Sequence, residues 1–87
     1  MKTWTDDQLA DYETALETIG NVIAIASRDI AEEREKSQPD ARLIDELFEL
    51  QKQLNCERRN LRIEDKTAVR KAIEIYGRIV RSGELNW

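Results

Sequence analysis

The most regular pattern in the chain is a run of apolar residues near the N-terminus that recurs every three or four positions. This apolar seam consists of Leu9, Tyr12, Leu16, Ile19, Ile23, Ala26 and Ile30. Such spacing places the side chains on one side of an α-helix over more than three heptads, as at the a and d positions of a coiled coil. The seam predicts one long amphipathic helix over about residues 5–36, against which the rest of the chain packs.

A strong start signal precedes this helix. Thr5 and Gln8 stand at the two positions of a capping box, in which each side chain accepts a hydrogen bond from the other residue's backbone N–H. Trp4 and Leu9 stand at the two positions of a hydrophobic staple. Two aspartates follow Thr5, where the positive end of the helix dipole favours acidic residues. We therefore expect the helix to begin directly after Thr5.

Pro39 marks the start of a second helix. Proline disfavours helical backbone in the residue before it and suits the first position of a new helix. We expect a short connection at Ser37-Gln38 and a helix over about 39–61, with Asp40 in its first turn. A connection this short makes the two helices antiparallel neighbours. The apolar positions that continue the seam are Leu43, Leu47, Leu50, Leu54 and Leu61.

The apolar pattern loses its phase near the end of the second helix. We expect a break over residues 62–67, followed by a third helix over about 66–81 with Asp65 or Thr67 as its cap. Neither glycine nor proline enforces this break. A continuous helix over 40–81 therefore stays open as an alternative.

The third helix is apolar over two adjacent stripes, so it must contact more than one neighbour. The stripes are Val69, Ile73, Tyr76, Val80 and Ala68, Ala72, Ile75, Ile79. In the tail, Leu85 and Trp87 are large enough to fold back onto the bundle. The whole pattern predicts a single all-α domain over 1–87, a small three-helix bundle built on a long N-terminal helix in an antiparallel hairpin. Three wide apolar faces in 87 residues also predict a homodimer.

Composition agrees with a soluble helical bundle. Hydrophobic residues make up 40% of the chain and charged residues 37%. The longest uncharged run covers residues 18–27, too short to span a bilayer, and the N-terminus lacks the apolar core of a signal peptide. The single cysteine, Cys56, cannot form an intramolecular disulfide. We expect a cytoplasmic protein that does not associate with membranes.

Charge is divided unevenly along the chain. Residues 1–50 hold 13 acidic and 5 basic side chains, whereas residues 51–87 hold 5 acidic and 9 basic ones. The acidic first helix can lie beside the basic later helices within one fold, or the two charged surfaces can bind partners.

The residues that most enzymes require are scarce in this chain. It contains no histidine, one cysteine and three scattered glycines, which argues against an acid–base site, a structural zinc site and a phosphate-binding loop. Carboxylate pairs such as Glu32-Glu33 and Asp45-Glu46 are sequence neighbours. On a helix such neighbours point about 100° apart, so we interpret them as solvated. We expect no enzyme activity, no cofactor or metal, and no small-molecule substrate.

A first candidate binding surface lies on the first helix opposite the seam, and we term it the back face. It is neutral in a helix that is otherwise acidic. The back face consists of Thr14, Thr18, Asn21 and Ile25, with an acidic rim of Asp7, Asp11 and Glu17. Interfaces typically combine a less charged centre with a polar rim. Three occupants remain open: the third helix, a second copy of the chain, or a foreign protein.

A second candidate surface is a basic patch on the second helix. It consists of Lys52, Arg58, Arg59, Arg62 and Lys66. Like charges at i, i+4 spacing repel each other, so helix stability does not explain them. A site for a nucleic acid or an acidic protein would explain them, as would pairing with the acidic first helix.

These observations favour a non-catalytic protein–protein interaction module. We expect a small acidic inhibitor or adaptor that binds a larger protein or nucleoprotein, a class that includes phage inhibitors, immunity proteins and antitoxins. The alternative is a small dimeric nucleic-acid-binding regulator that uses the basic patch.

Overall fold

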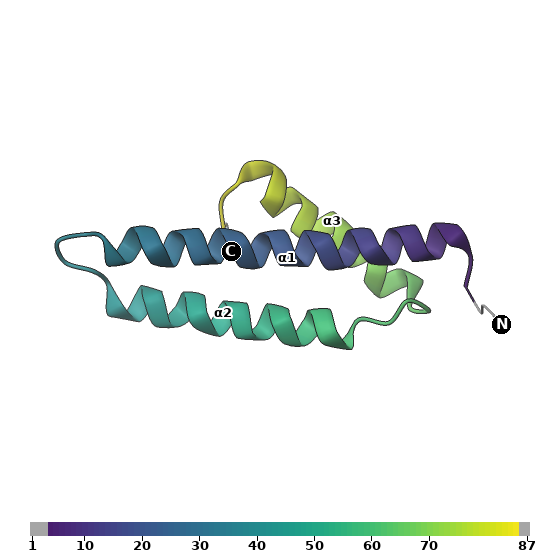
Figure 1. Cartoon of the computed structure of the whole chain (residues 1–87), viewed down its shortest axis with the longest axis horizontal. Coiled ribbons are helices and arrows are strands. Elements are labelled where there is room, and N and C mark those ends of the chain that lie inside the picture. Colours follow the sequence, from purple (N-terminus) through teal and green to yellow (C-terminus); the bar gives the residue numbers. More distant parts are fainter. Residues whose placement is uncertain (1–3, 86–87) are drawn as a thin grey trace.

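The computed structural model describes residues 4–85, which form three helices: α1 (Asp6–Arg34), α2 (Ala41–Asn60) and α3 (Lys66–Ser82). The long α1 is central, with α2 antiparallel along one side and α3 packed on another, as Figure 1 shows. Within residues 4–85, α2 and α3 each pack closely on α1, the Tyr76 hydroxyl of α3 donates to the Glu57 carboxylate of α2, and no strand is present. The predicted all-α class, with a hairpin on a long first helix, is confirmed.

The predicted start of α1 is confirmed. The Thr5 backbone N–H donates to Gln8 Oε1 at 2.8 Å, and the Gln8 backbone N–H donates to Thr5 Oγ1 at 3.1 Å. Both bonds of the capping box are therefore made, which satisfies a free N–H of the first helical turn. Trp4 and Leu9 are each half-buried, and the staple between them stays a prediction.

The connection between α1 and α2 differs from the prediction at both ends. The first helix ends at Arg34 rather than near residue 36, and Pro39 precedes the second helix instead of beginning it. Asp40 is the N-cap, so its placement in the first turn was wrong. Its carboxylate accepts hydrogen bonds from the backbone N–H groups of Arg42 and Leu43, both at 3.1 Å. An aspartate at the cap satisfies these donors, which have no partner inside the helix.

Glu33 is buried at this connection, so the interpretation of Glu32-Glu33 as a solvated pair is wrong for Glu33. Only 5% of its surface is exposed. One carboxylate oxygen accepts from Lys36 Nζ at 2.8 Å and the other from the Asp40 backbone N–H at 3.0 Å. These two hydrogen bonds, the one from Lys36 foremost, hold the pKa of Glu33 below its ordinary value. One carboxylate therefore joins the last turn of α1 to the cap of α2.

The break between α2 and α3 is confirmed, and the continuous-helix alternative is wrong. The second helix ends at Asn60, and Leu61 has an extended backbone. The Tyr12 hydroxyl donates to the Leu61 carbonyl oxygen at 3.3 Å, which ties the break to α1. Asp65 is the N-cap of α3 and accepts from the Ala68 backbone N–H at 3.0 Å. Chain reversal at this point allows α3 to return along α1.

The most buried line on α1 shares Ile19, Ala26 and Ile30 with the predicted seam but differs from it elsewhere. Ala15 and Val22, which lie outside the seam, are fully buried together with Ile19. Ile23, expected to be buried, is only half-buried. Because α1 contacts one helix on each side, its most buried line lies between α2 and α3 and not at the centre of the α2 contact. The main core cluster comprises Ala15, Ile19, Val22, Leu54, Leu61, Val69, Ala72 and Ile79.

None of the helices within residues 4–85 is both long and apolar enough to cross a membrane.

Candidate functional site

The third helix covers only part of the hairpin. At 1.5 Å per residue, the 29 residues of α1 span roughly 43 Å, whereas the 17 residues of α3 span roughly 26 Å. The end of α3 is held beside the C-terminal third of α1, where Arg28 Nη2 donates to the Gly83 carbonyl oxygen at 2.8 Å. Beyond that point α1 and α2 alone form the hairpin (Figure 1). The turn end of the hairpin is therefore left uncovered by α3.

A groove of about 570 Å³ lies at this uncovered end, and we term it the hairpin-end groove. Side chains of α1, of α2 and of the segment after α3 line it. Its apolar residues are Leu43, Leu47, Leu50 and Leu85, and its polar residues are Asp29, Glu32, Glu33, Lys36, Glu46, Glu49 and Gln53.

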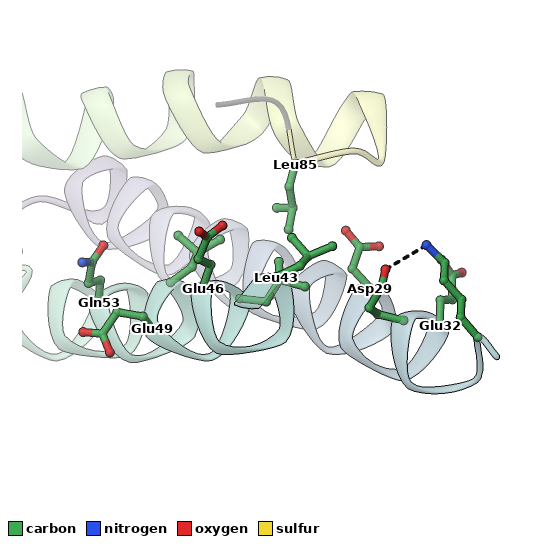
Figure 2. A pocket seen from close by; sticks show the side chains of 11 residues that line it. Asp29, Glu32, Leu43, Glu46, Glu49, Gln53 and Leu85 are labelled. Atoms are coloured by element: carbon green, nitrogen blue, oxygen red, sulfur yellow. Dashed lines mark hydrogen bonds and ion pairs between the residues drawn. The ribbon is translucent and has the colours of Figure 1, made fainter. Parts of the chain in front are cut away.

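The floor of the groove is a leucine stripe of α2 in which Leu50 is half-buried, Leu47 is buried and Leu43, nearest the turn, is exposed. The exposed fraction is 2% for Leu54, inside the three-helix core, and rises to 7% at Leu47 and 37% at Leu43. Leu85 extends from the chain after α3 toward Leu43, as Figure 2 shows, and is half-buried. This confirms the expected fold-back for Leu85, whereas Trp87 lies outside the described residues. The groove is thus the open end of a surface that α3 covers further along.

Carboxylates stand on both walls of the groove. Asp29 and Glu32 belong to α1, and Glu46 and Glu49 to α2 (Figure 2). Among the described residues that line the groove, Lys36 is the one cation, and it is hydrogen-bonded to the buried Glu33. Ion pairs whose two side chains are both solvent-exposed, unlike that of Glu33, contribute little and exchange readily. The exposed ion pairs at the rim are Arg28–Asp29 at 3.0 Å, Arg28–Glu32 at 3.9 Å and Arg42–Glu46 at 3.4 Å. The rim therefore presents negative charge to an incoming ligand.

The predicted back face lies partly against α3 and partly in solvent. Thr14 and Asn21 are exposed, whereas Thr18 and Ile25 are half-buried, and Ile25 packs against the core cluster. The Thr14 hydroxyl donates to the Ala10 carbonyl oxygen at 2.9 Å, and the Thr18 hydroxyl to the Thr14 carbonyl oxygen at 2.7 Å. Both hydroxyl protons are thus used within α1.

The acidic rim of the back face is divided in the same way. Asp7 and Glu17 are exposed, and Asp11 is half-buried. Asp7 and Asp11 line a hollow together with Lys66 and Arg70 of α3. The third helix therefore flanks the N-terminal part of this rim, and the exposed remainder is open to a partner.

The basic patch does not form one ladder on a helix face. Because α2 ends at Asn60, the i, i+4, i+8 spacing of Arg58, Arg62 and Lys66 does not place them on one continuous helix. The Arg58 guanidinium lies against α1 at Gly20, and Arg62 pairs with Glu64 at 3.9 Å. Lys52 and Arg59 are exposed on α2. Among the described residues, no ion pair joins this patch to Asp7, Asp11 or Glu17 of α1.

Sequence reasoning missed the hairpin-end groove. Its leucines were recognised as seam residues and its acids as solvated charges. The unequal lengths of the predicted first and third helices carried the missing signal, because a shorter third helix must leave part of the hairpin open.

Comparisons with known proteins identify no relative: the chain matches no family model, no curated protein and no solved structure. Within residues 4–85, no group of three or more Cys, Asp or Glu side chains is arranged to hold a metal ion.

Proposed function

We propose that this chain is a non-catalytic protein-binding module, a small acidic inhibitor or adaptor that binds a larger protein through the hairpin-end groove. One observation carries the proposal: a leucine floor, buried at Leu47, half-buried at Leu50 and exposed at Leu43, stands between carboxylates on both walls. Protein interfaces concentrate binding energy in such an apolar centre within a polar rim. Burial of one large apolar side chain of a partner is worth about 1.5–3 kcal/mol.

The charge of the groove favours a protein over a nucleic acid as the ligand. The carboxylates Asp29, Glu32, Glu46 and Glu49 repel phosphate groups, whereas they attract lysine and arginine side chains. Charges at the rim mainly increase the association rate, and the apolar centre mainly slows dissociation. The exposed acids in the rim of the back face, Asp7 and Glu17, extend the same negative field along α1. They likewise favour a partner with basic side chains.

Leu43 and Ile75 offer a matched pair of variants to test the proposal. Both are exposed apolar residues on helices, at 37% and 42%, but only Leu43 lines the groove. We expect affinity capture from a lysate of the source organism, treated with nuclease, to recover the same protein with wild type and with Ile75→Asp. Leu43→Asp should lose it, since a charge would stand in the apolar centre.

Thermal melts followed by circular dichroism would show that both variants are folded. Equal recovery with Leu43→Asp and Ile75→Asp would contradict a groove-dependent function. Recovery that disappears after nuclease treatment would instead favour the nucleic-acid alternative.

A further inference from the structure

We infer that the hairpin-end groove binds a basic amphipathic α-helix of the partner, placed as a continuation of α3 along the hairpin. This inference rests on the proposed function, because it specifies which element of a protein partner enters the groove. Two independent observations carry it, the shape of the leucine stripe and the charge of the two walls.

The shape observation concerns what already covers the same stripe. Leu54 is buried in a core to which α3 contributes Val69, Ala72 and Ile79. Leu47 and Leu43, one and nearly two turns beyond Leu50, leave that core and line the groove. A surface that accepts a helix in one part has the same ridges and grooves a few turns further on. The groove is therefore shaped for a helix that follows the path of α3.

The end of α3 places one apolar side chain of the chain itself at the groove. The helix stops at Gly83, whose backbone is in the left-handed conformation with φ 71°. Leu85 follows, and it lines the groove together with Leu43. An apolar residue of an incoming helix would therefore pack next to Leu85 and enlarge the apolar surface that Leu85 begins.

The charge observation specifies the occupant. Acids stand on both the α1 wall and the α2 wall, so a helix with basic residues on both sides of its apolar stripe is complementary to the groove. The chain's own α3 is a helix of this kind and packs beside acids of α1. Its basic residues are Lys66, Arg70, Lys71, Arg78 and Arg81, against one acid, Glu74. Lys66 and Arg70 line a hollow with Asp7 and Asp11.

The length of the groove sets the size of the binding segment. On α2 it extends from Leu43 to Gln53, which at 1.5 Å per residue is roughly 15 Å, about three helical turns. A partner helix of this length carries apolar anchors at i, i+3 or i+4, and i+7, the usual pattern of a helix bound in a groove. Lysine or arginine at the flanking positions would face Asp29 and Glu32 on one wall and Glu46 and Glu49 on the other.

A synthetic probe isolates the helical and charge requirements. The probe is a peptide of about 14 residues, roughly four turns, made only of leucine and lysine with leucine at helical spacing. Its control has the same composition, but leucine and lysine alternate, which favours a strand. Binding to the full chain is measured by fluorescence anisotropy. We expect the helical probe to bind at least about tenfold tighter than the alternating control, a difference of about 1.4 kcal/mol.

Matched variants of the protein locate the binding site. Glu46→Gln/Glu49→Gln and Glu13→Gln/Glu17→Gln change the net charge equally, but only the first pair lies on the groove. We expect the substitutions at Glu46 and Glu49 to lower the affinity for the helical probe about tenfold, and those at Glu13 and Glu17 to have little effect on it. Leu43→Asp should abolish binding, and Ile75→Asp should leave it unchanged. Equal losses within either comparison, or equal affinity for the two peptides, would overturn the inference.

The same measurements separate this inference from the proposed function. If capture of the partner protein depends on Leu43 but the helical probe does not displace it, the proposed function stands and the inference that a helix occupies the groove is overturned. A change of mass in sedimentation on Leu43→Asp, in protein without probe, would show that a second copy occupies the groove and would overturn it as well. Displacement of the captured protein by the helical probe but not by the alternating control would support both.

Discussion

A hydrogen bond of 3.0 Å from the backbone N–H of Asp40 to the buried carboxylate of Glu33 joins the two helices of the hairpin at their turn. Asp40 in turn caps α2 through its own carboxylate. Glu33 therefore fixes the position at which α2 begins, and with it the register of the leucine stripe that forms the groove. A buried polar side chain at the end of the groove thus connects its two walls.

We predict that Glu33→Gln lowers stability at pH 7, because a neutral amide is a weaker acceptor for the Lys36 ammonium and the Asp40 N–H. The exposed neighbour supplies the control, and Glu32→Gln should leave the urea midpoint nearly unchanged. If Glu32→Gln lowered the urea midpoint as much as Glu33→Gln does, the role of the buried carboxylate would be contradicted.

The pH dependence of this contribution follows from the direction of the pKa shift. The folded state holds the pKa of Glu33 below its ordinary value of 4.5, so its contribution is complete above that pH. It is lost as the pH falls through the lower folded pKa. The pKa of Lys36 is raised above 10.5 by the same hydrogen bond, so its contribution is lost as the pH rises through the higher folded value. We expect the stability difference between wild type and Glu33→Gln to shrink at both extremes in urea titrations.

A second prediction compares two isoleucines of the predicted seam. Ile19 is fully buried, whereas Ile23 is half-buried. We expect Ile19→Ala to cost about 2–5 kcal/mol, the range for truncation of a large core side chain, and Ile23→Ala to cost clearly less. Chemical denaturation of the two variants measures this difference. Equal losses would show that the two positions are equally packed.

These residues also show how far the sequence determines the fold. The spacing of the seam was sufficient to predict α1 and the hairpin, because a 3.6-residue period leaves few alternatives. It could not rank Ile19 above Ile23 or include Val22, since burial depends on the side of α1 that α3 occupies. That side is set by the chain reversal at Leu61 and Asp65. The hydrophobic periodicity of the sequence does not determine the direction of this reversal.

Glu33 and the hairpin-end groove show the corresponding limit for function. Sequence neighbours on a helix diverge, so Glu32 and Glu33 were interpreted alike, yet the turn returns the chain over Glu33 alone. The groove arises from the position at which α3 ends relative to α1, a tertiary relationship. The proposed back face, in contrast, was defined from α1 alone, and α3 covers part of it.

A third prediction concerns two glycines in different backbone conformations. A Cβ at Gly20 would lie 3.7 Å from Arg58 Cζ, an ordinary contact, and the residue is inside α1. Gly20→Ala should therefore stabilise the protein by about 0.5–1 kcal/mol. Gly83 has φ 71°, which disfavours a side chain, so Gly83→Ala should destabilise it. Thermal melts should show shifts of opposite sign, and shifts of the same sign would contradict one of the two assignments.

The expected homodimer stays a prediction. The described residues expose three large apolar side chains, Leu43, Phe48 and Ile75. We expect sedimentation equilibrium to show a dimer at micromolar concentration for wild type, with the same mass for Leu43→Asp, because the groove is reserved for a partner helix. A mass of 10.2 kDa over the whole concentration range would show that the chain is a monomer.

The last prediction tests the nucleic-acid alternative directly. Binding through the basic patch would rest on counterion release, so the affinity would fall steeply with salt. Each lost phosphate contact would lower the slope by about one unit. Arg58 packs against α1 and Arg62 pairs with Glu64, while the chain carries a net charge of −4 that opposes a polyanion.

We therefore expect no salt-dependent binding of the wild-type chain to duplex DNA or RNA in anisotropy titrations at low salt. Arg58→Ala/Arg59→Ala should likewise leave binding of the leucine–lysine helix unchanged, since neither arginine lines the hairpin-end groove. Tight binding of the wild type to nucleic acid, weakened by this double variant with a shallower salt slope, would reverse the ranking of the two functions. A polyanion and a basic helix require opposite charges on the binding surface, so the two titrations assign the functional surface to the basic patch or to the groove.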